Sequence, residues 1–310
     1  NGQKKKEGSY RHGKEQGIWV SWYLNGQKNE QTVYKHYMRN GVWIKWYESG
    51  QKGREIHYQD NVRNGLDITW YENGQKFHET SYENGVKHGL WTLWYENGDK
   101  KEQLIYNNDK AREVTRYHGG KKNGPWALWY DNGNKKEEGH YKNGKLDKDY
   151  SQWYESGRLK EQGFFKGGVK HGLWTLWYEN GDKKEQLIYN NDKAREVTRY
   201  HGGKKNGPWA LWYDNGNKKE EGHYKNGKLD KDYSQWYESG RLKEQGFFKG
   251  SVKNGLWITW YESGNKKQEG AFFNGQMDGR WFFWDEDGLI ENIQIYNLSV
   301  LITDRVIDND

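Results

Sequence analysis

The side chains that most often carry out chemistry are scattered through this sequence without forming a site. There are 10 histidines, such as His88 and His140, and most stand alone close to a Gly- or Asn-rich segment. No two have the spacing of metal ligands, and the absence of cysteine excludes thiolate sites and disulfides. The segment "DNGNKKE" from Asp131 is similar to a calcium loop, but Lys135 occupies the place of a required oxygen ligand. We therefore expect no metal and no cofactor.

Catalysis and specific nucleic-acid binding are also disfavoured by the residues present. The sequence has no nucleophile–base constellation and no glycine loop that leads into a helix to bind phosphate. Carboxylates such as those in "KKEE" at 135–138 accompany lysines, as cross-strand partners do in sheets. The Lys-Lys pairs beside aromatic residues could follow a nucleic-acid backbone, but acids neutralise almost every pair. We predict that the chain has no catalytic residues and binds no specific nucleic acid.

Aromatic residues distinguish this chain from a disordered one. The mean hydropathy is −1.35, which is typical of disorder, yet 17% of the residues are aromatic, with 19 Trp and 24 Tyr. Trp and Tyr bury large apolar areas while a polar atom stays hydrated. The net charge of +6 comes from mixed runs of both signs, which favours solubility. These features predict a folded protein whose core consists of rings.

A short phrase recurs along the sequence. Units aligned on the Trp of "WY" repeat every 24 residues, with two spacings of 35, at Trp22, Trp46, Trp70, Trp94, Trp129, Trp153, Trp177, Trp212, Trp236, Trp260 and Trp284. The two long units contain the insert "IYNNDKAREVTRYHGG", which has strand–turn–strand character. Residues 85–167 return unchanged as residues 168–250, by natural duplication or by design. A repeat array tolerates such an extension, whereas a catalytic pocket seldom would, so we predict a protein that is not an enzyme.

Each unit reads as a β-hairpin. An aromatic run, "GLWTLWY" from Gly89, precedes Asn-Gly, and a charged run follows that ends in Tyr106 and a second turn segment. Asn-Gly between strand-like runs is a strong hairpin signal, and 40 Gly against 2 Pro disfavour helices. We predict an all-β fold: a long, single-layer, twisted antiparallel meander or solenoid of about eleven hairpins. The array covers residues 1–297, and residues 298–310 form a C-terminal capping segment.

Alternation along the strands divides the residues between two faces. The column of Thr92, which is small or β-branched in the units compared except at Phe282, and the unbroken Trp94 column predict the packed face. The other face is expected to leave a second aromatic column partly exposed, and exposed aromatics favour binding. The alternative is that Tyr and Lys stems cover these rings, so that they only stabilise the sheet. The partner-binding candidates in this column are Trp43, Trp91, Trp126, Trp174, Trp209, Trp257 and Trp281.

The repeated pattern resembles a known family. G-x-W-x-x-W-Y-x-N-G-x-K-x-x-E-x-x-Y-x-N-G, clearest in "GLWITWYESGNKKQEGAFFNGQMDG" at 255–279, is similar to the MORN repeat in its bacterial variant. That variant occurs in proteins grouped with the YwqK-type antitoxins, and the resemblance covers about residues 1–297. It implies an extended β scaffold that binds a protein, with toxin neutralisation as one role. The two long units depart from the pattern.

These observations lead to one functional prediction and one alternative. We expect a scaffold that binds a protein partner through an aromatic and charged β surface. The alternative is an array that binds carbohydrate or cell envelope through many weak contacts. An unpaired N-terminal edge predicts self-association, although truncation would also produce it. No apolar run is long enough to span a membrane, and no leader is evident, which is compatible with a bacterial cytoplasmic or an exported protein.

Overall fold

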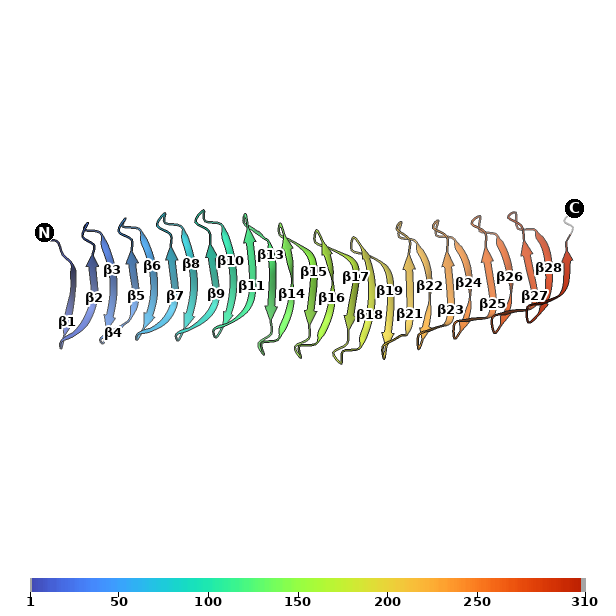
Figure 1. The fold of residues 1–310 in the computed structure, drawn as a ribbon, viewed down its shortest axis with the longest axis horizontal. Helices are drawn as coiled ribbons and strands as arrows, with labels where there is room; N and C mark the ends of the chain where they lie inside the picture. Colours follow the sequence, from blue (N-terminus) through green and yellow to red (C-terminus); the bar gives the residue numbers. More distant parts are fainter. Residues whose placement is uncertain (1, 308–310) are drawn as a thin grey trace. The chain divides into compact units, whose positions relative to one another are not determined.

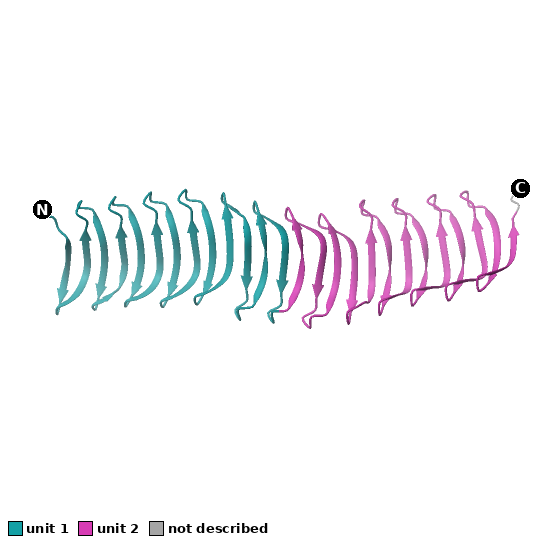
Figure 2. Cartoon of the chain, in the orientation of Figure 1, with its two compact units in different colours: residues 1–157 teal, residues 158–310 magenta. Residues whose placement is uncertain are grey.

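The computed structural model describes residues 2–307, and all regular secondary structure in this range is β. The chain forms two compact units, Asn1–Gly157 and Arg158–Asp310 (Figure 2). In each unit the strands follow one another in chain order as an open antiparallel sheet of a single layer (Figure 1). The predicted all-β antiparallel meander is therefore confirmed. Residues 2–307 contain no helix that could cross a membrane.

The strands are short, between 2 and 9 residues long. Those of the first unit are β1 (Lys6–Arg11), β2 (Lys14–Trp22), β3 (Lys28–Lys35), β4 (Met38–Arg39), β5 (Gly41–Trp46), β6 (Lys52–Gln59), β7 (Val62–Trp70), β8 (Lys76–Glu83), β9 (Val86–Trp94), β10 (Lys100–Asn107), β11 (Lys110–His118), β12 (Lys121–Lys122), β13 (Gly124–Trp129), β14 (Lys135–Lys142) and β15 (Lys145–Trp153). Those of the second unit are β16 (Leu159–Lys166), β17 (Val169–Trp177), β18 (Lys183–Asn190), β19 (Lys193–His201), β20 (Lys204–Lys205), β21 (Gly207–Trp212), β22 (Lys218–Lys225), β23 (Lys228–Trp236), β24 (Leu242–Lys249), β25 (Val252–Trp260), β26 (Lys266–Phe273), β27 (Gln276–Trp284), β28 (Ile290–Asn297) and β29 (Val300–Val306).

Two kinds of turn alternate along each sheet. After β9 the chain makes a five-residue turn in which the N–H of Asp99 bonds to the Asn97 side chain and only Gly98 has a positive φ. Between β8 and β9 the loop has two residues, Asn84 and Gly85, both with positive φ. The Asn-Gly of "WYENG" therefore stands in a hairpin turn, as predicted, but in one of five residues and not in a tight two-residue turn. That turn, which requires left-handed backbone at both positions, lies at the other end of the strands.

Tyrosine hydroxyls join neighbouring hairpins at the five-residue turns. The Tyr23 hydroxyl donates to the carbonyl of Trp46 at 2.7 Å, and Tyr47 bonds in the same way to Trp70 at 2.6 Å. Equivalent bonds recur from Tyr71, Tyr130, Tyr213, Tyr237 and Tyr261. The Tyr of "WY" is thus an inter-repeat link, which explains why it follows the Trp in almost every unit.

The 35-residue units each contain one additional strand. We call the strand that carries both tryptophans of the repeat, such as β9, the "W–W" strand. A normal unit supplies this strand and one other, whereas β11 stands between β10 and the next "W–W" strand, β12–β13. Three strands are an odd number, so the later "W–W" strands run in the opposite direction to the earlier ones. The five-residue turns consequently move from one end of the strands to the other, as the turns after β9 and β13 show in Figure 1.

The additional strand also exchanges the two faces of the sheet. Directly opposed residues share a face, and the ladder from Trp91 runs through Leu104 and Val114 to Ala127. Trp126, next to Ala127, therefore lies on the face opposite to Trp91. Side-chain bonds on that face agree, because Thr92 accepts from Gln103 at 3.4 Å and Gln103 accepts from the Tyr117 hydroxyl at 3.1 Å. We call this change of direction and face the inversion.

The second unit repeats the inversion within its own strands. The ladder from Trp174 passes through Leu187 and Val197 to Ala210, so Trp209 lies on the opposite face from Trp174. Chirality makes the two changes inseparable. A hairpin whose strands run in the opposite direction, but whose strands keep the same order along the sheet, is related to the normal hairpin by a half-turn about the axis along which the strands follow one another. This half-turn also exchanges the two faces of the twisted sheet.

The tyrosine link is interrupted at each inversion. No carbonyl accepts from the hydroxyls of Tyr95 and Tyr178 among the described residues, and the two side chains are 38% and 42% exposed. An arginine of the additional strand caps the next turn instead. Arg112 donates to the carbonyls of Tyr130 and Asp131 at 2.6 and 2.8 Å, and Arg195 does the same in the second unit.

The two ends of the array are sheet edges. β29 covers most of the predicted capping segment and pairs with β28, and all seven of its residues are exposed. Residues 308–310 of that segment lie outside the described residues. β1 pairs with β2 and with no other strand among residues 2–307. Capping by 298–310 and self-association through the N-terminal edge stay predictions.

Candidate binding surface

The predicted partner-binding tryptophans form the core of the sheet. Trp174, Trp257 and Trp281 are 0%, 2% and 1% exposed, Trp126 and Trp209 are also buried, and Trp43 and Trp91 are half-buried. The expectation of a partly exposed column therefore holds only for Trp43 and Trp91, and the burial of the other rings agrees with the alternative that they stabilise the sheet. The reason is position along the strand, because each ring projects from the interior of its strand, away from the turns.

Glycines in the preceding strands admit these rings. Trp174 lies flat over Gly163 of β16, where an added Cβ would approach its ring to 2.1 Å. The Phe165 ring packs edge-on at 5.0 Å, the Lys170 ammonium lies 3.9 Å from the ring centre, and the indole N–H donates to the carbonyl of Phe164. Gly246 and Gly270 receive Trp257 and Trp281 in the same way. Mid-strand glycine is the sequence signal that indicated this close approach.

Of the two columns predicted as the packed face, the Thr92 column is largely buried, with Thr92 and Ile68 3% and 8% exposed, whereas the Trp94 column is only half-buried. Its members stand at strand ends beside the five-residue turns, where a register shift opens the ladder. A lysine of the preceding hairpin covers several of these rings, as Lys76 does for Trp94 with its ammonium 5.7 Å from the ring centre. Lys28, Lys52, Lys135, Lys218 and Lys266 make equivalent contacts. These rings are stabilised by cation–π contacts and are not free binding platforms.

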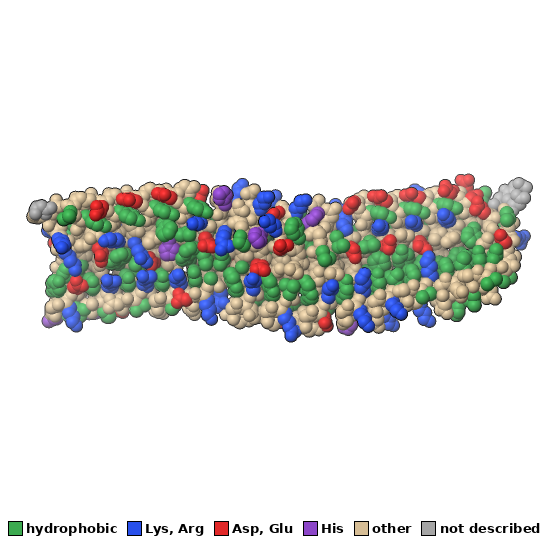
Figure 3. Space-filling view, viewed as in Figure 1, with side chains coloured by type: hydrophobic (Ala, Val, Ile, Leu, Met, Phe, Trp, Pro, Cys, Tyr) green, Lys and Arg blue, Asp and Glu red, His purple; other side chains and the backbone are tan. Residues whose placement is uncertain are grey.

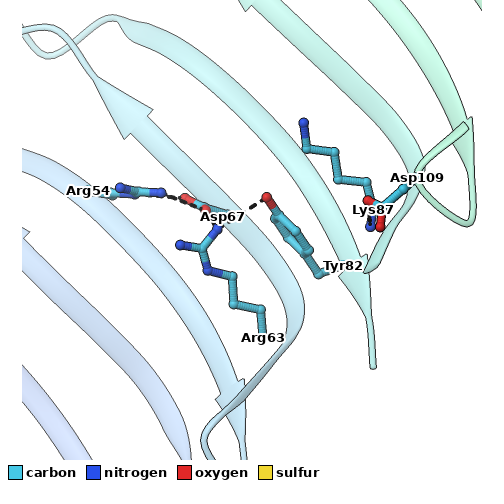
Figure 4. Close-up of polar contacts among 6 residues, drawn as sticks. All are labelled: Arg54, Arg63, Asp67, Tyr82, Lys87 and Asp109. Carbon is cyan, nitrogen blue, oxygen red and sulfur yellow. Dashed lines mark hydrogen bonds and ion pairs between the residues drawn. The ribbon is translucent and has the colours of Figure 1, made fainter. Parts of the chain in front are cut away.

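One unit replaces the core tryptophan with a buried carboxylate, Asp67, which is 1% exposed (Figure 4). Arg54 binds both carboxylate oxygens, at 3.0 and 2.9 Å, and Arg63 approaches at 3.3 Å while donating to the Tyr82 hydroxyl. Such pairing offsets the cost of burying the charge. Two arginines already satisfy the carboxylate, so the cluster cross-links β6 and β7.

The titratable groups around this cluster do not form a catalytic arrangement. Burial is the largest influence on His78 and lowers its pKa, the charge of Asp67 opposes that shift, and Lys87 reinforces it. The His78 ring packs against Trp91 with centroids 5.4 Å apart. Within residues 2–307 no three His, Asp or Glu side chains converge as a metal site would require.

The most exposed apolar side chains inside the sheets lie on the face away from each core tryptophan. They occupy the position before the Trp and the residue opposite it, as in the pairs Leu90–Ile105 and Leu173–Ile188. We call these positions the apolar column; its exposed members are Ile18, Leu66, Leu90, Ile105, Phe164, Leu173, Ile188, Phe247 and Leu256. Sequence reasoning missed it, although the Leu of "GLW" was the available signal.

Charged residues run beside the apolar residues. In the view of Figure 3, hydrophobic side chains form rows across the strands, flanked by Lys, Arg, Asp and Glu. Many of these charges pair locally, as in Lys52–Glu55 at 2.8 Å and Lys253–Glu244 at 2.6 Å. The candidate surface is therefore an apolar column between partly neutralised charges, carried on a rigid sheet.

The class of protein follows from these features: an array of β-hairpins joined by hydrogen bonds between equivalent residues of successive repeats. The chain belongs to the MORN repeat family, and the family description "MORN repeat variant" matches seven segments, 15–36, 39–60, 87–108, 122–143, 170–191, 205–226 and 253–274. No curated protein matches the sequence.

Solved structures were compared with the chain as well. A chain in the crystal structure of TcdB2-TccC3-Cdc42 aligns with 90% of this chain at 11% identity and a TM-score of 0.17. A chain in the structure of the Photorhabdus luminescens Tc holotoxin pore, mutation TccC3-D651A, aligns with 90% at 11% identity and a TM-score of 0.19. This chain spans 18% and 17% of those chains, and such TM-scores carry no argument about its fold or function.

Proposed function

We propose that this chain is a non-enzymatic scaffold that binds a protein partner through the apolar column and the charges beside it. The exposure of the column carries the proposal: Leu173 and Leu256, each in the middle of a strand, are 54% and 55% exposed. Apolar groups kept in water at the same place in several repeats favour an interaction surface. A toxin is the partner class that the resemblance implies.

The carbohydrate alternative has lost its main support. It required free ring faces in the Trp91 column, and those rings are buried or half-buried, while lysines cover several rings of the Trp94 column. No other group of exposed rings recurs in every repeat. Protein binding is therefore the function that we carry forward.

The test is affinity capture from a lysate of the source organism. The bait is this chain, compared with a variant in which Leu66, Leu90, Leu173 and Leu256 become Asp. Asp149 and Asp232 already occupy this position in two units, so the substitution is compatible with the repeat. We expect one protein in stoichiometric amount with the native chain and none with the variant. Equal recovery by both, or nothing above background from either folded bait, would refute the proposal.

A further inference from the structure

The hairpin of β22 and β23 contains a lysine with a strained backbone. Near the start of each "W–W" strand the register shifts at a residue with a positive φ, and this residue is glycine in all repeats but two, as at Gly207 and Gly255. In β23, where Tyr233 replaces the first tryptophan, the residue is Lys231 with a φ of 72°. Lys148 of the first unit is the other exception and has the same φ. Left-handed backbone is unfavourable for lysine, and such strain is typical of functional sites.

Lys231 lines a cavity of about 320 Å³ on β21, β22 and β23, which are neighbouring strands of the second unit (Figure 1). His223 and Lys225 of β22 line the same cavity. Gly65 holds the place of Lys231 in an earlier repeat, and a Cβ added there would lie 3.0 Å from the Cβ of His57, the counterpart of His223. The positive φ therefore directs the Lys231 side chain to the face of the sheet on which His223 lies.

A second cavity, of about 250 Å³, lies on the other side of His223, further from the two-residue turn. Glu221, Asp232 and Ser234 line it, and Glu221 lies directly opposite Ser234. Glu221 already pairs with Lys218 at 2.6 Å. Asp232 is exposed and has no ionic partner among the described residues. This cavity therefore offers one free carboxylate.

The cavity beside the turn offers free cations instead. Lys225 and Lys231 are exposed, and neither has an ionic partner within residues 2–307. Lys228 lies directly opposite Lys225, a cross-strand pair of like charges that is unfavourable. The acid that lines this cavity, Asp230, accepts the N–H of Gly250 at 3.4 Å. Positive charge therefore predominates at this end of the hairpin.

Free charges of opposite sign are thus separated along one hairpin. Asp232 lies beside His223, and Lys225 is two residues beyond His223 on the same face, a distance of about 7 Å along the strand. An anion bound by the lysines would be repelled by Asp232, and a cation bound by Asp232 would be repelled by the lysines. A ligand with one charge of each sign avoids both penalties.

We propose that the two cavities together bind a small zwitterion of the ω-amino acid class. Its ammonium group would pair with Asp232, and its carboxylate would lie between Lys225 and Lys231, about 7 Å away. Each free charge would then gain a charge-assisted hydrogen bond, which offsets the strain at Lys231. The inference goes beyond the proposed function and does not depend on it.

The first unit contains the same site in its sequence. Residues 122–151 are identical to residues 205–234, and Lys148 has the φ of Lys231. We therefore expect each chain to bind two molecules of ligand, one in each unit.

The probe is δ-aminovalerate, added to the full chain at about pH 7, where both of its charges are present. The readout is the nuclear magnetic resonance signals of the His140 and His223 rings. Valerate and pentylammonium, each with one of the two charges on a chain of the same length, are matched controls, and glycine tests the separation of the charges. We expect both ring signals to shift with δ-aminovalerate. The three controls should bind more weakly by roughly tenfold, because each lacks one ionic contact.

Substitutions that other repeats already contain test the residues of the site without disturbing the fold. Asp232→Leu and Lys225→Gln copy Leu256 and Gln59, which hold the same positions, and Lys231→Gly restores the usual glycine. Each should weaken binding in the second unit and leave the first unit unchanged. Lys231→Gly should also raise the Tm, because it relieves the strain.

Several results would overturn the inference. They are equal binding of valerate or pentylammonium, binding that the substitutions leave unchanged, and no binding of δ-aminovalerate at either histidine. A lower Tm for Lys231→Gly would also overturn it, because the lysine would then stabilise the fold instead of straining it.

Discussion

Removal of one additional strand tests the inversion directly. Residues 110–120 are β11 with its following turn, and their deletion joins "YNND" to "KKNGPW" in the pattern of the normal "YENGVKHGLW". Asn108 and Asp109 already have the positive φ values of a two-residue turn, 50° and 62°. We expect the shortened chain to fold as a regular array in which Trp126 returns to the face of Trp91.

A pair of cysteines makes this change measurable as a distance. In the native sheet β11 separates Gln103 from Ala127, so their Cα atoms are about 10 Å apart at two strand spacings of about 4.8 Å, and their side chains occupy opposite faces. A disulfide needs Cα atoms closer than about 7 Å. In the shortened chain the register of Glu79 with Thr92 would place the two residues directly opposite each other, at about 5 Å.

The assay is disulfide formation under mild oxidation, read by mass spectrometry without reduction. The chain has no cysteine of its own, so the engineered pair is the only one. We expect Gln103→Cys with Ala127→Cys to form a bridge in the shortened chain and not in the native one. Val114→Cys with Ala127→Cys, directly opposed in the native sheet, is the positive control. A bridge between positions 103 and 127 in the full-length chain, or none in a shortened chain with native circular dichroism, would refute the inversion.

Three further predictions concern stability, each measured by denaturation followed through tryptophan fluorescence or circular dichroism. Gly163→Ala pushes a methyl group into the buried Trp174 ring and should destabilise the fold by about 1–3 kcal/mol, and no loss would contradict the packing described. Tyr47→Phe removes the 2.6 Å bond to a carbonyl and should cost about 0.5–1.5 kcal/mol, whereas Tyr95→Phe, at the inversion, should cost almost nothing; equal costs would argue against the interrupted link. Burial lowers the pKa of His78, so the unfolded chain binds the proton more strongly, and the associated stability is complete above about pH 6.5 and declines as the pH falls. His78→Gln should therefore reduce the loss of Tm between pH 7.5 and 5.5, and an unchanged loss would exclude this residue as its source.

Much of the architecture could be read from the sequence because repeat proteins depend on contacts between neighbouring units. The period, the hairpins, the two 35-residue units and the all-β fold follow from the Trp spacing and the Gly-rich turns. The interruption of the core column by Asp67 was also visible. The type of each turn could not be predicted from the sequence, because Asn-Gly is compatible with both the five-residue turn and the two-residue turn.

The sequence determined that each face would carry an aromatic column, but only the tertiary structure decided which column is buried. Both columns fit the alternation of side chains along a strand. Their burial differs because Trp174 lies inside its strand, where Gly163 admits the ring, whereas Trp94 lies at a strand end, where Lys76 covers it. The exposure of Leu173 follows from the same choice. The inversion could also be recognised only from the strand pairing. The insert is evident in the sequence, but its effect on strand direction and on the face of the sheet emerges only when three strands pair in register within a chiral sheet.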